Sequence, residues 1–374
     1  MAKRSSSSFV RAGRLRLGAV VAAALSAACH PPPPMGPVRL EAGCQDVTTL
    51  QGRADTAASV QWIGPASPDE VRTLTAWCAR VGPALVHTQG RTHAGDAVSR
   101  LAIISWNVHV GRGDLARLLD DLRSGQLTGG EPVQDFVLLL QEAVRIQPLA
   151  GSRARGGEGA ASDDAFRDIA DWGRDLGLAV FYAPSMRNDQ PPLEGHQADR
   201  GNAILSTLQL TDLQVIDLPF ERQRRAALVA TVQVPDRPGA SAPLRVASVH
   251  LDVWPALLPS LVDPNRRFRQ VAGLLESAAT DSLPVVIGGD FNTASVRDPL
   301  ITNLRKQFPE SVLPPSCRTK YRFCPDYIFQ RLAPSWAATP YRILDDKYGS
   351  DHRPLVMVVR REAVTHPSDV AEHR

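Results

Sequence analysis

From Leu101 onward the chain alternates short, almost entirely apolar runs with amphipathic segments, and this alternation restricts the possible fold more than any other feature. The apolar runs predict buried strands, and they cover residues 101–107, 136–142, 178–183, 202–207, 225–233, 244–251, 284–289, 325–330 and 354–360. Helical spacing of apolar residues predicts helices that begin near Asp114, Asp164 and Arg266. Many strands with few helices between them favour an α/β fold of two stacked sheets flanked by helices over one doubly wound sheet.

The first hundred residues precede this pattern and have a different composition. His30 to Pro37 is proline-rich and predicts a stiff, polyproline-like spacer. Further on, Ser67-Pro68-Asp69-Glu70 is a capping box with proline at the first helical position, and it predicts a helix over 68–80. We therefore expect four parts, which are an export signal over 1–29, a spacer and short preface over 30–98, a main domain over 99–361 and a polar tail over 362–374.

The N-terminus has the composition of an export signal. Residues 1–28 carry five basic side chains and no acidic one, and the basic part is followed by an apolar run from Leu17 to Leu25. Small residues directly before Cys29 resemble the lipobox of bacterial lipoproteins, although Leu25 stands four positions before the cysteine instead of three. An ordinary cleaved signal is the alternative. The pattern predicts an exported protein that is periplasmic or anchored at the cell surface through a lipid on Cys29, or else secreted.

The positive charge of the chain belongs largely to this signal. The 374 residues have a formal net charge of +3, but without the five signal residues 37 basic side chains stand against 39 acidic ones. The remainder has no global attraction for polyanions, so any attraction is local. Solvated surface is the plainer interpretation of the three basic runs, which are Arg222/Arg224/Arg225, Arg266/Arg267/Arg269 and Arg318/Lys320/Arg322. The third run adjoins Asp326 and is the best candidate for substrate choice.

Cysteine usage agrees with export. If Cys29 is acylated, four cysteines remain, and an even number in an oxidising compartment suggests two disulfides. Three pairings are formally possible, and proximity in sequence favours Cys44–Cys78 and Cys317–Cys324. A zinc site is the alternative, but no Cys-x-x-Cys spacing supports it.

Polar side chains stand at the ends of the predicted strands. Asn107 and Glu142 each terminate an apolar run. The other polar residues in such positions are His250, Asp252, Asp290, Asn292, Asp326, Asp351 and His352. A single Asn or Asp in this position is usually a turn former. Carboxylates, amides and imidazoles at several strand ends converge when the ends share one rim, where loops build a site on a rigid scaffold.

The order of these motifs resembles the endonuclease/exonuclease/phosphatase superfamily, which includes pancreatic deoxyribonuclease and exonuclease III-type enzymes. The resemblance covers about residues 99–361, and Gly-Asp-Phe-Asn at 289–292 with Ser-Asp-His at 350–352 is its most specific part. The remaining motifs are Ser-Trp-Asn at 105–107, Leu-Gln-Glu at 140–142, Gly-Asn-Ala-Ile-Leu-Ser at 201–206, Val-His-Leu at 249–251 and Asp-Tyr-Ile-Phe at 326–329. The resemblance implies a four-layer α/β/β/α sandwich of two stacked mixed sheets, with the site at one end.

The resemblance also implies a role for each polar residue in phosphate-ester hydrolysis. Asn107, Glu142 and Asp351 are implied in the metal site, with Glu142 as the principal ligand. Hard oxygen ligands without a nearby cysteine suit Mg²⁺ or Mn²⁺ better than zinc. Asp290 is implied to orient or deprotonate the attacking water, and Asp326 to fix the tautomer of His352. Contacts to phosphate or proton transfer are implied for His250, Asn292 and His352, and a further phosphate contact for Asn202.

These roles favour an exported metal-dependent phosphodiesterase of nuclease type, whose partner is a phosphodiester substrate such as nucleic acid. A sphingomyelinase-like phospholipid hydrolase is an alternative, for which Trp254, Leu257, Leu258 and Leu261 would be the membrane-touching segment. Hydrolysis of inositol phosphates is a third possibility. A non-catalytic surface lipoprotein is disfavoured because Glu142, Asp290 and His352 are all retained. No protein partner is predicted.

Overall fold

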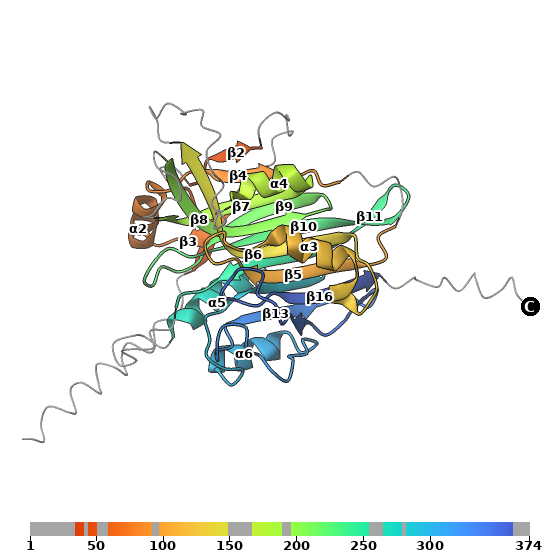
Figure 1. Cartoon of the computed structure of the whole chain (residues 1–374). Coiled ribbons are helices and arrows are strands. Elements are labelled where there is room, and N and C mark those ends of the chain that lie inside the picture. The colour runs from red at the N-terminus through yellow and green to blue at the C-terminus, as the bar shows by residue number, and fades with distance from the viewer. Residues whose placement is uncertain are drawn as a thin grey trace, which may run out of the picture.

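Two mixed β-sheets stack face to face at the centre of the protein (Figure 1). The computed structural model describes residues 34–40, 44–50, 59–91, 97–148, 167–188, 196–253, 265–278 and 282–361. In these residues one sheet has seven strands, in the order β1 (Met35–Pro37), β3 (Val60–Pro65), β9 (Leu210–Asp217), β10 (Ala226–Arg237), β11 (Ala240–His250), β12 (Val285–Asp290) and β13 (Asp326–Arg331). The other sheet has nine, in the order β14 (Trp336–Ala338), β16 (Leu355–Arg361), β5 (Leu101–Asn107), β6 (Asp135–Pro148), β8 (His196–Ser206), β7 (Ala179–Asn188), β4 (Ala84–His87) and β2 (Val47–Thr49), with β15 (Arg342–Ile343) paired to β16.

Burial on both faces explains why the central strands are apolar at nearly every position. In β5 all seven residues are buried. Leu101 and Ile103 belong to the core between the two sheets, whereas Ile104 and Trp106 belong to the core on the outer side. A strand covered on both sides cannot alternate apolar with polar residues. The runs predicted as buried strands correspond to β5, β6, β7, β8, β10, β11, β12, β13 and β16.

Helices cover the outer face of each sheet. The apolar sides of α3 (Leu115–Arg123) and α4 (Ile169–Leu176) pack on the nine-stranded sheet. On the other side, α5 (Arg266–Ala278) and α6 (Pro299–Gln307) pack on the seven-stranded sheet. A single-turn helix, η2 (Gln126–Thr128), follows α3. The order of helices, sheet, sheet and helices confirms the predicted four-layer α/β/β/α sandwich.

The N-terminal segment forms part of both sheets, which differs from the predicted spacer and separate preface. β1 pairs with β3, and β3 runs parallel to β9 at the edge of the seven-stranded sheet. β2 pairs with β4, which continues the nine-stranded sheet beside β7. Pro37 is compatible with β1 because an edge strand leaves one side without ladder partners. Described segments before residue 99 thus supply edge strands to both sheets, and the boundary at residue 99 stays a prediction.

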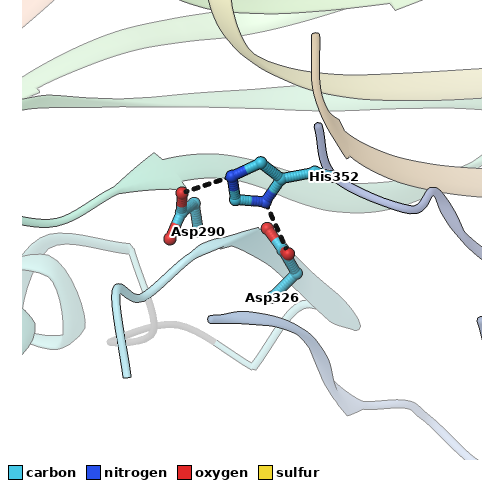
Figure 2. A group of neighbouring side chains, drawn as sticks. All are labelled: Asp290, Asp326 and His352. Carbon is cyan, nitrogen blue, oxygen red and sulfur yellow. Dashed lines mark hydrogen bonds and ion pairs between the residues drawn. The ribbon is translucent and has the colours of Figure 1, made fainter. Parts of the chain in front are cut away.

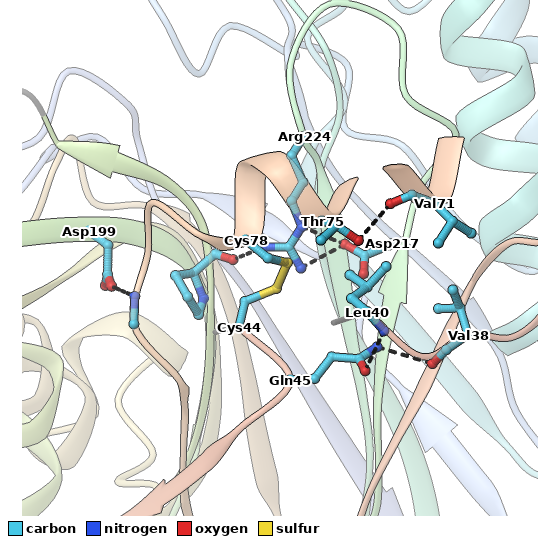
Figure 3. Close-up of a disulfide and its surroundings, with 12 residues drawn as sticks. Val38, Leu40, Cys44, Gln45, Val71, Thr75, Cys78, Asp199, Asp217 and Arg224 are labelled. Atoms are coloured by element: carbon cyan, nitrogen blue, oxygen red, sulfur yellow. Dashed lines mark hydrogen bonds and ion pairs between the residues drawn. A yellow bond between two sulfur atoms is a disulfide. The ribbon is translucent and has the colours of Figure 1, made fainter. Parts of the chain in front are cut away.

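Helix α2 (Pro68–Cys78) begins where the capping box predicts. Ser67 Oγ accepts a hydrogen bond from the backbone N–H of Glu70 (3.4 Å). At the other end, Cys78 forms a disulfide with Cys44 (Figure 3), and a second disulfide joins Cys317 to Cys324. Both pairings favoured by sequence proximity are confirmed. The first disulfide fixes the chain before β2 to the end of α2.

Several other predictions differ from the structure or lie outside it. β9 and α6 were not predicted, and α4 begins at Ile169 because Asp168 caps it. The described residues do not include the signal with Cys29, the start of the proline-rich spacer, the loop at 150–163, the apolar segment at 254–261 or the tail at 362–374. Among the residues described, no helix has the length and apolar character needed to cross a membrane.

Arg224 is fully buried and links the two sheets, although its basic run was interpreted as solvated surface. Its Nε donates to Asp217 Oδ1 in β9 (2.7 Å), and its Nη1 donates to the carbonyl of Pro184 in β7 (Figure 3). We expect Arg224→Ala to lower the free energy of unfolding in urea by about 3–5 kcal/mol, because it leaves the Asp217 carboxylate buried without its counter-charge. Arg222→Ala, at an exposed neighbouring position, is the control and should change stability by less than about 0.5 kcal/mol. Equal losses of unfolding free energy in the two variants would contradict the role of Arg224 as a buried link between the sheets.

Candidate active site

Three strand ends of the seven-stranded sheet place polar side chains in one row. His250 ends β11 and is the register partner of Asp290, which ends the parallel strand β12. Asp290 is in turn the register partner of Asp326, which begins the antiparallel strand β13. The strand ends predicted to share one rim do so, because two parallel strands and one antiparallel strand bring these positions side by side.

The nine-stranded sheet contributes Asn107 from the end of β5. Its Nδ2 donates to Asp290 Oδ2 (3.0 Å), which connects the two sheets at this rim. Its Oδ1 accepts from the backbone N–H of His109 (3.0 Å), so the amide orientation is fixed from both ends. Ser350 Oγ donates to the carbonyl of Asn107 (2.6 Å) and accepts from the N–H of His352 (3.0 Å). This serine holds the loop that carries His352 against β5.

His352 lies between two carboxylates (Figure 2). Its Nδ1 is hydrogen-bonded to Asp326 Oδ2 (2.8 Å), and its Nε2 lies 3.8 Å from Asp290 Oδ2. The ring is 1% exposed, and Nε2 has no hydrogen-bond partner within the described residues. Burial alone would lower the pKa of His352, but the charge and hydrogen bond of Asp326, helped by Asp290, raise it to about 9. The imidazole is therefore charged at neutral pH and directs an N–H into the site.

His250 is the second imidazole and has the opposite protonation preference. Its Nε2 lies 3.7 Å from the same oxygen, Asp290 Oδ2. Burial and the positive charges of Arg225 and His352 lower the pKa of His250 well below its ordinary value. For Asp290 itself, burial and the neighbouring charge of Asp326 raise the carboxyl pKa. The site thus combines one charged imidazole, one neutral imidazole and a carboxylate made more basic by its surroundings.

Glu142 enters the same site from an irregularity in β6. The pairing of β6 with β8 shifts register between Leu140 and Ala143, and Glu142 has a φ of +55° at this bulge. Bulges re-aim a side chain relative to a regular strand. The Glu142 carboxylate lines a cavity of about 260 Å³ together with His250 and Asp290. Its one ion pair among the described residues is with Arg200, at 3.8 Å.

Asp351 is a further carboxylate close to Nε2 of His352. Its Oδ2 forms an ion pair with Lys320 Nζ (2.7 Å), and its Oδ1 lies 3.7 Å from His352 Nε2. Burial would raise the pKa of Asp351, but the hydrogen bond and charge of Lys320 and the charge of His352 lower it overall. Oδ1 is buried and has no hydrogen-bond partner within the described part of the chain. The same oxygen lies 3.9 Å from His109 Nδ1.

Glu142, Asn107 and Asp351 carry the kind of oxygen donor that a hard divalent cation prefers. Glu142 offers a carboxylate that no hydrogen bond within the described residues occupies, and Asp351 offers the unpartnered Oδ1. Asn107 adds an amide oxygen at the rim. The described carboxylates and imidazoles also contain one tight group that could chelate a metal, Asp290 with Asp326 and His352. In that group Asp326 already holds His352 through a hydrogen bond (2.8 Å). The role of Glu142 as the principal metal ligand remains a prediction.

Two predicted phosphate ligands have amide groups that bind the protein backbone. Asn202 Nδ2 donates to the carbonyls of Ala226 (2.8 Å) and Ser248 (3.2 Å) across the sheet interface. Asn292, at a φ of +52°, donates its Nδ2 to the carbonyl of Leu251 (2.8 Å), and its backbone N–H donates to Asp290. Both residues line the cavity. Their contacts to phosphate remain predictions, and their observed contacts hold the walls of the site.

Four cationic side chains line the cavity, and the sequence did not assign them to the site individually. They are Arg200, Arg222, Arg225 and Lys320. Arg225 is 5% exposed and is oriented by Asp252 Oδ1 (3.4 Å). The first and third basic runs therefore reach the site. The second run has structural contacts instead, of which Arg267 with Asp298 (3.0 Å) is one.

The chain belongs to the Endonuclease/Exonuclease/phosphatase family, whose model matches residues 104–352. Members of this family are hydrolases that act on phosphodiester bonds. No match was found among the curated proteins.

Solved structures with a similar fold include an endonuclease/exonuclease/phosphatase from Beutenbergia cavernae, which is 21% identical with a TM-score of 0.49 and covers 70% of this chain and 72% of its own. The human Nocturnin catalytic domain with bound sulfate is 16% identical with a TM-score of 0.46, over 72% of this chain and 98% of its own. A family protein from Leptotrichia buccalis is 14% identical with a TM-score of 0.48, over 70% of this chain and 99% of its own. At these scores the family assignment rests on the family model.

Proposed function

We propose that this protein is an exported, divalent-metal-dependent phosphodiesterase of nuclease type. The observation that carries the proposal is the joint position of Glu142, His250 and Asp290 on one cavity, with the Asp326–His352 pair directly beside Asp290. Cationic side chains around the same cavity suit an anionic phosphate substrate, because charge-assisted hydrogen bonds to phosphate oxygens are the strong ones. The two disulfides support an oxidising compartment, and so support export.

The protein groups divide the chemistry by their protonation. Glu142, Asn107 and Asp351 would hold Mg²⁺ or Mn²⁺, which when bound supplies Lewis-acid stabilisation of phosphoryl charge. Asp290 Oδ2, with its raised pKa, is suited to accept the proton of the attacking water.

Phosphate binding and leaving-group protonation fall to the remaining side chains. His352 Nε2–H is suited to donate to a phosphoryl oxygen or to the leaving oxygen. Neutral His250 is suited to donate a hydrogen bond without adding charge. Arg225 and Lys320 offset the negative charge of the substrate.

Purified protein is expected to hydrolyse bis(p-nitrophenyl) phosphate and plasmid DNA with Mg²⁺ or Mn²⁺, and excess EDTA should return both rates to background, because the cation neutralises phosphoryl charge. Release of p-nitrophenolate and gel electrophoresis of the plasmid measure the two reactions. Sphingomyelin and inositol phosphates belong in the same panel. Absence of metal-dependent hydrolysis across the whole panel would remove the enzyme proposal, and hydrolysis of sphingomyelin alone would replace a nuclease by a phospholipid hydrolase.

A further inference from the structure

The Cys317–Cys324 disulfide closes a small hairpin beside the active site. Lys320 and Phe323 pair across it, with the N–H of Phe323 donating to the carbonyl of Lys320 (2.8 Å). Its base is held against the catalytic residues, because Thr319 Oγ1 donates to Asp326 Oδ2 and the N–H of Arg353 donates to the carbonyl of Thr319 (2.9 Å). This 317–324 hairpin therefore has a fixed position relative to His352.

The tip of the 317–324 hairpin presents an aromatic ring to solvent. Tyr321 is 72% exposed, the most exposed of the large apolar side chains in the described residues. It has a φ of +51°, a left-handed conformation that a bulky residue adopts only at a cost. Asn or Gly would adopt this turn more easily, so the requirements of the turn itself do not explain the tyrosine. Phe323, at 39% exposed, stands on the same hairpin.

Cations on and beside the hairpin connect the exposed ring to Asp351. Lys347 Nζ lies 5.0 Å from the centre of the Tyr321 ring and donates to the carbonyl of Asp351 (3.0 Å). Lys320, the residue before Tyr321, lines the cavity and pairs with Asp351. The guanidinium of Arg322 lies 5.2 Å from the Phe323 ring. A ring open to solvent thus stands next to Lys320, a cation that lines the cavity.

We propose that Tyr321 stacks on an unpaired base of a single-stranded nucleic acid whose backbone phosphate is held in the cavity. Exposed aromatic side chains alternating with cations are the arrangement by which proteins bind single strands, since a base has a stacking face and its phosphates are anionic. A lipid surface is the less suitable partner, because the hairpin exposes two aromatic rings among three cations and no aliphatic side chain. The inference deepens the proposed function by naming its substrate as a flexible strand with accessible bases.

The test compares Tyr321→Ala with Tyr321→Trp in the purified protein. We expect Tyr321→Ala to raise KM for a single-stranded oligodeoxynucleotide by about tenfold, while kcat/KM for bis(p-nitrophenyl) phosphate, which has no base, stays within about twofold. Tyr321→Trp should retain the low KM. Binding of a fluorescent oligonucleotide in EDTA, measured by anisotropy, should weaken by a similar factor in Tyr321→Ala. Val47→Ala, at an exposed apolar position on β2, is the matched control and should change neither quantity.

The outcomes separate the two proposals. If the unmodified protein does not hydrolyse bis(p-nitrophenyl) phosphate, the proposed function is contradicted. Oligonucleotide binding in EDTA would still test the role of Tyr321. Equal losses of Tyr321→Ala on both substrates would show that the hairpin only supports the catalytic residues. An unchanged KM and unchanged oligonucleotide binding would overturn the inference. A loss of Tyr321→Ala activity on sphingomyelin vesicles alone would also overturn the inference, because it would indicate that the ring contacts a membrane.

Discussion

Glu142→Gln is expected to reduce metal-dependent hydrolysis by about 1,000-fold or more. The substitution keeps the size of the side chain and removes its charge, and the stabilisation supplied by a bound cation amounts to several kcal/mol. Of the two carboxylates that line the cavity, Asp290 is held by hydrogen bonds from Asn107 and Asn292. Within the described residues, the one ion-pair partner of Glu142 is Arg200, at 3.8 Å. Glu142 is therefore the less constrained of these two carboxylates, which supports its proposed role as a metal ligand. Turnover of bis(p-nitrophenyl) phosphate over a range of Mn²⁺ concentrations measures the loss.

Mn²⁺ binding measured by calorimetry without substrate distinguishes a metal ligand from a general base. Glu142→Gln should weaken this binding, since a neutral amide is a poorer ligand than a carboxylate. Glu131→Gln is the control, because Glu131 is exposed and its ion-pair partners, Arg100 and Arg360, do not line the cavity. Undiminished Mn²⁺ binding by Glu142→Gln, or turnover close to that of the unmodified protein, would show that another residue holds the cation.

The strands that the sequence predicts best are those that are buried on both faces. β5 and β12 are recognisable because both of their faces are covered, so their apolar runs are continuous. β9 was missed because polar residues such as Asp212 and Gln214 interrupt it. Strands of three residues such as β1 and β2 have too few positions to show a period, and their pairing with β3 and β4 is set by tertiary contacts.

In the site, too, residues at the ends of buried strands could be predicted from the sequence, and residues positioned by tertiary contacts could not. Asp290 and Asp326 were placed correctly at one rim because each stands at the boundary of a recognisable strand. The separate surroundings of Arg224 and Arg225 could not be predicted, since one is bound to Asp217 between the sheets and the other reaches the cavity. Both residues precede β10, and which carboxylate each of them meets depends on segments far away in sequence. The basic runs were interpreted chiefly as solvated surface, and their positions at the cavity or between the sheets depend on these tertiary contacts.

Asp326→Asn is expected to lower kcat for bis(p-nitrophenyl) phosphate by about 100- to 10,000-fold with little change in KM. Asp326 Oδ2 accepts from His352 Nδ1 at 2.8 Å and lies one strand from Asp290, so it fixes the ring whose Nε2 faces the reacting groups. An amide in its place removes the charge that raises the pKa of His352 and allows the other tautomer. Thr319→Val is the matched control, since it removes the other hydrogen bond to Asp326 Oδ2 and keeps the carboxylate. We expect it to cost less than about tenfold.

The pH dependence of stability gives Asp326→Asn a readout independent of turnover. The pKa of His352 is about 9 in the folded protein, against about 6.5 in an unfolded chain. The corresponding free energy of unfolding, on the order of 3 kcal/mol, is present in full below pH 6.5 and is lost as the pH rises toward 9. Urea denaturation of the metal-free protein should show this decline, and Asp326→Asn should flatten it because the raised pKa requires the carboxylate. A decline of equal size in Asp326→Asn, or a kcat within tenfold of the unmodified protein, would show that Asp326 does not control the proton of His352.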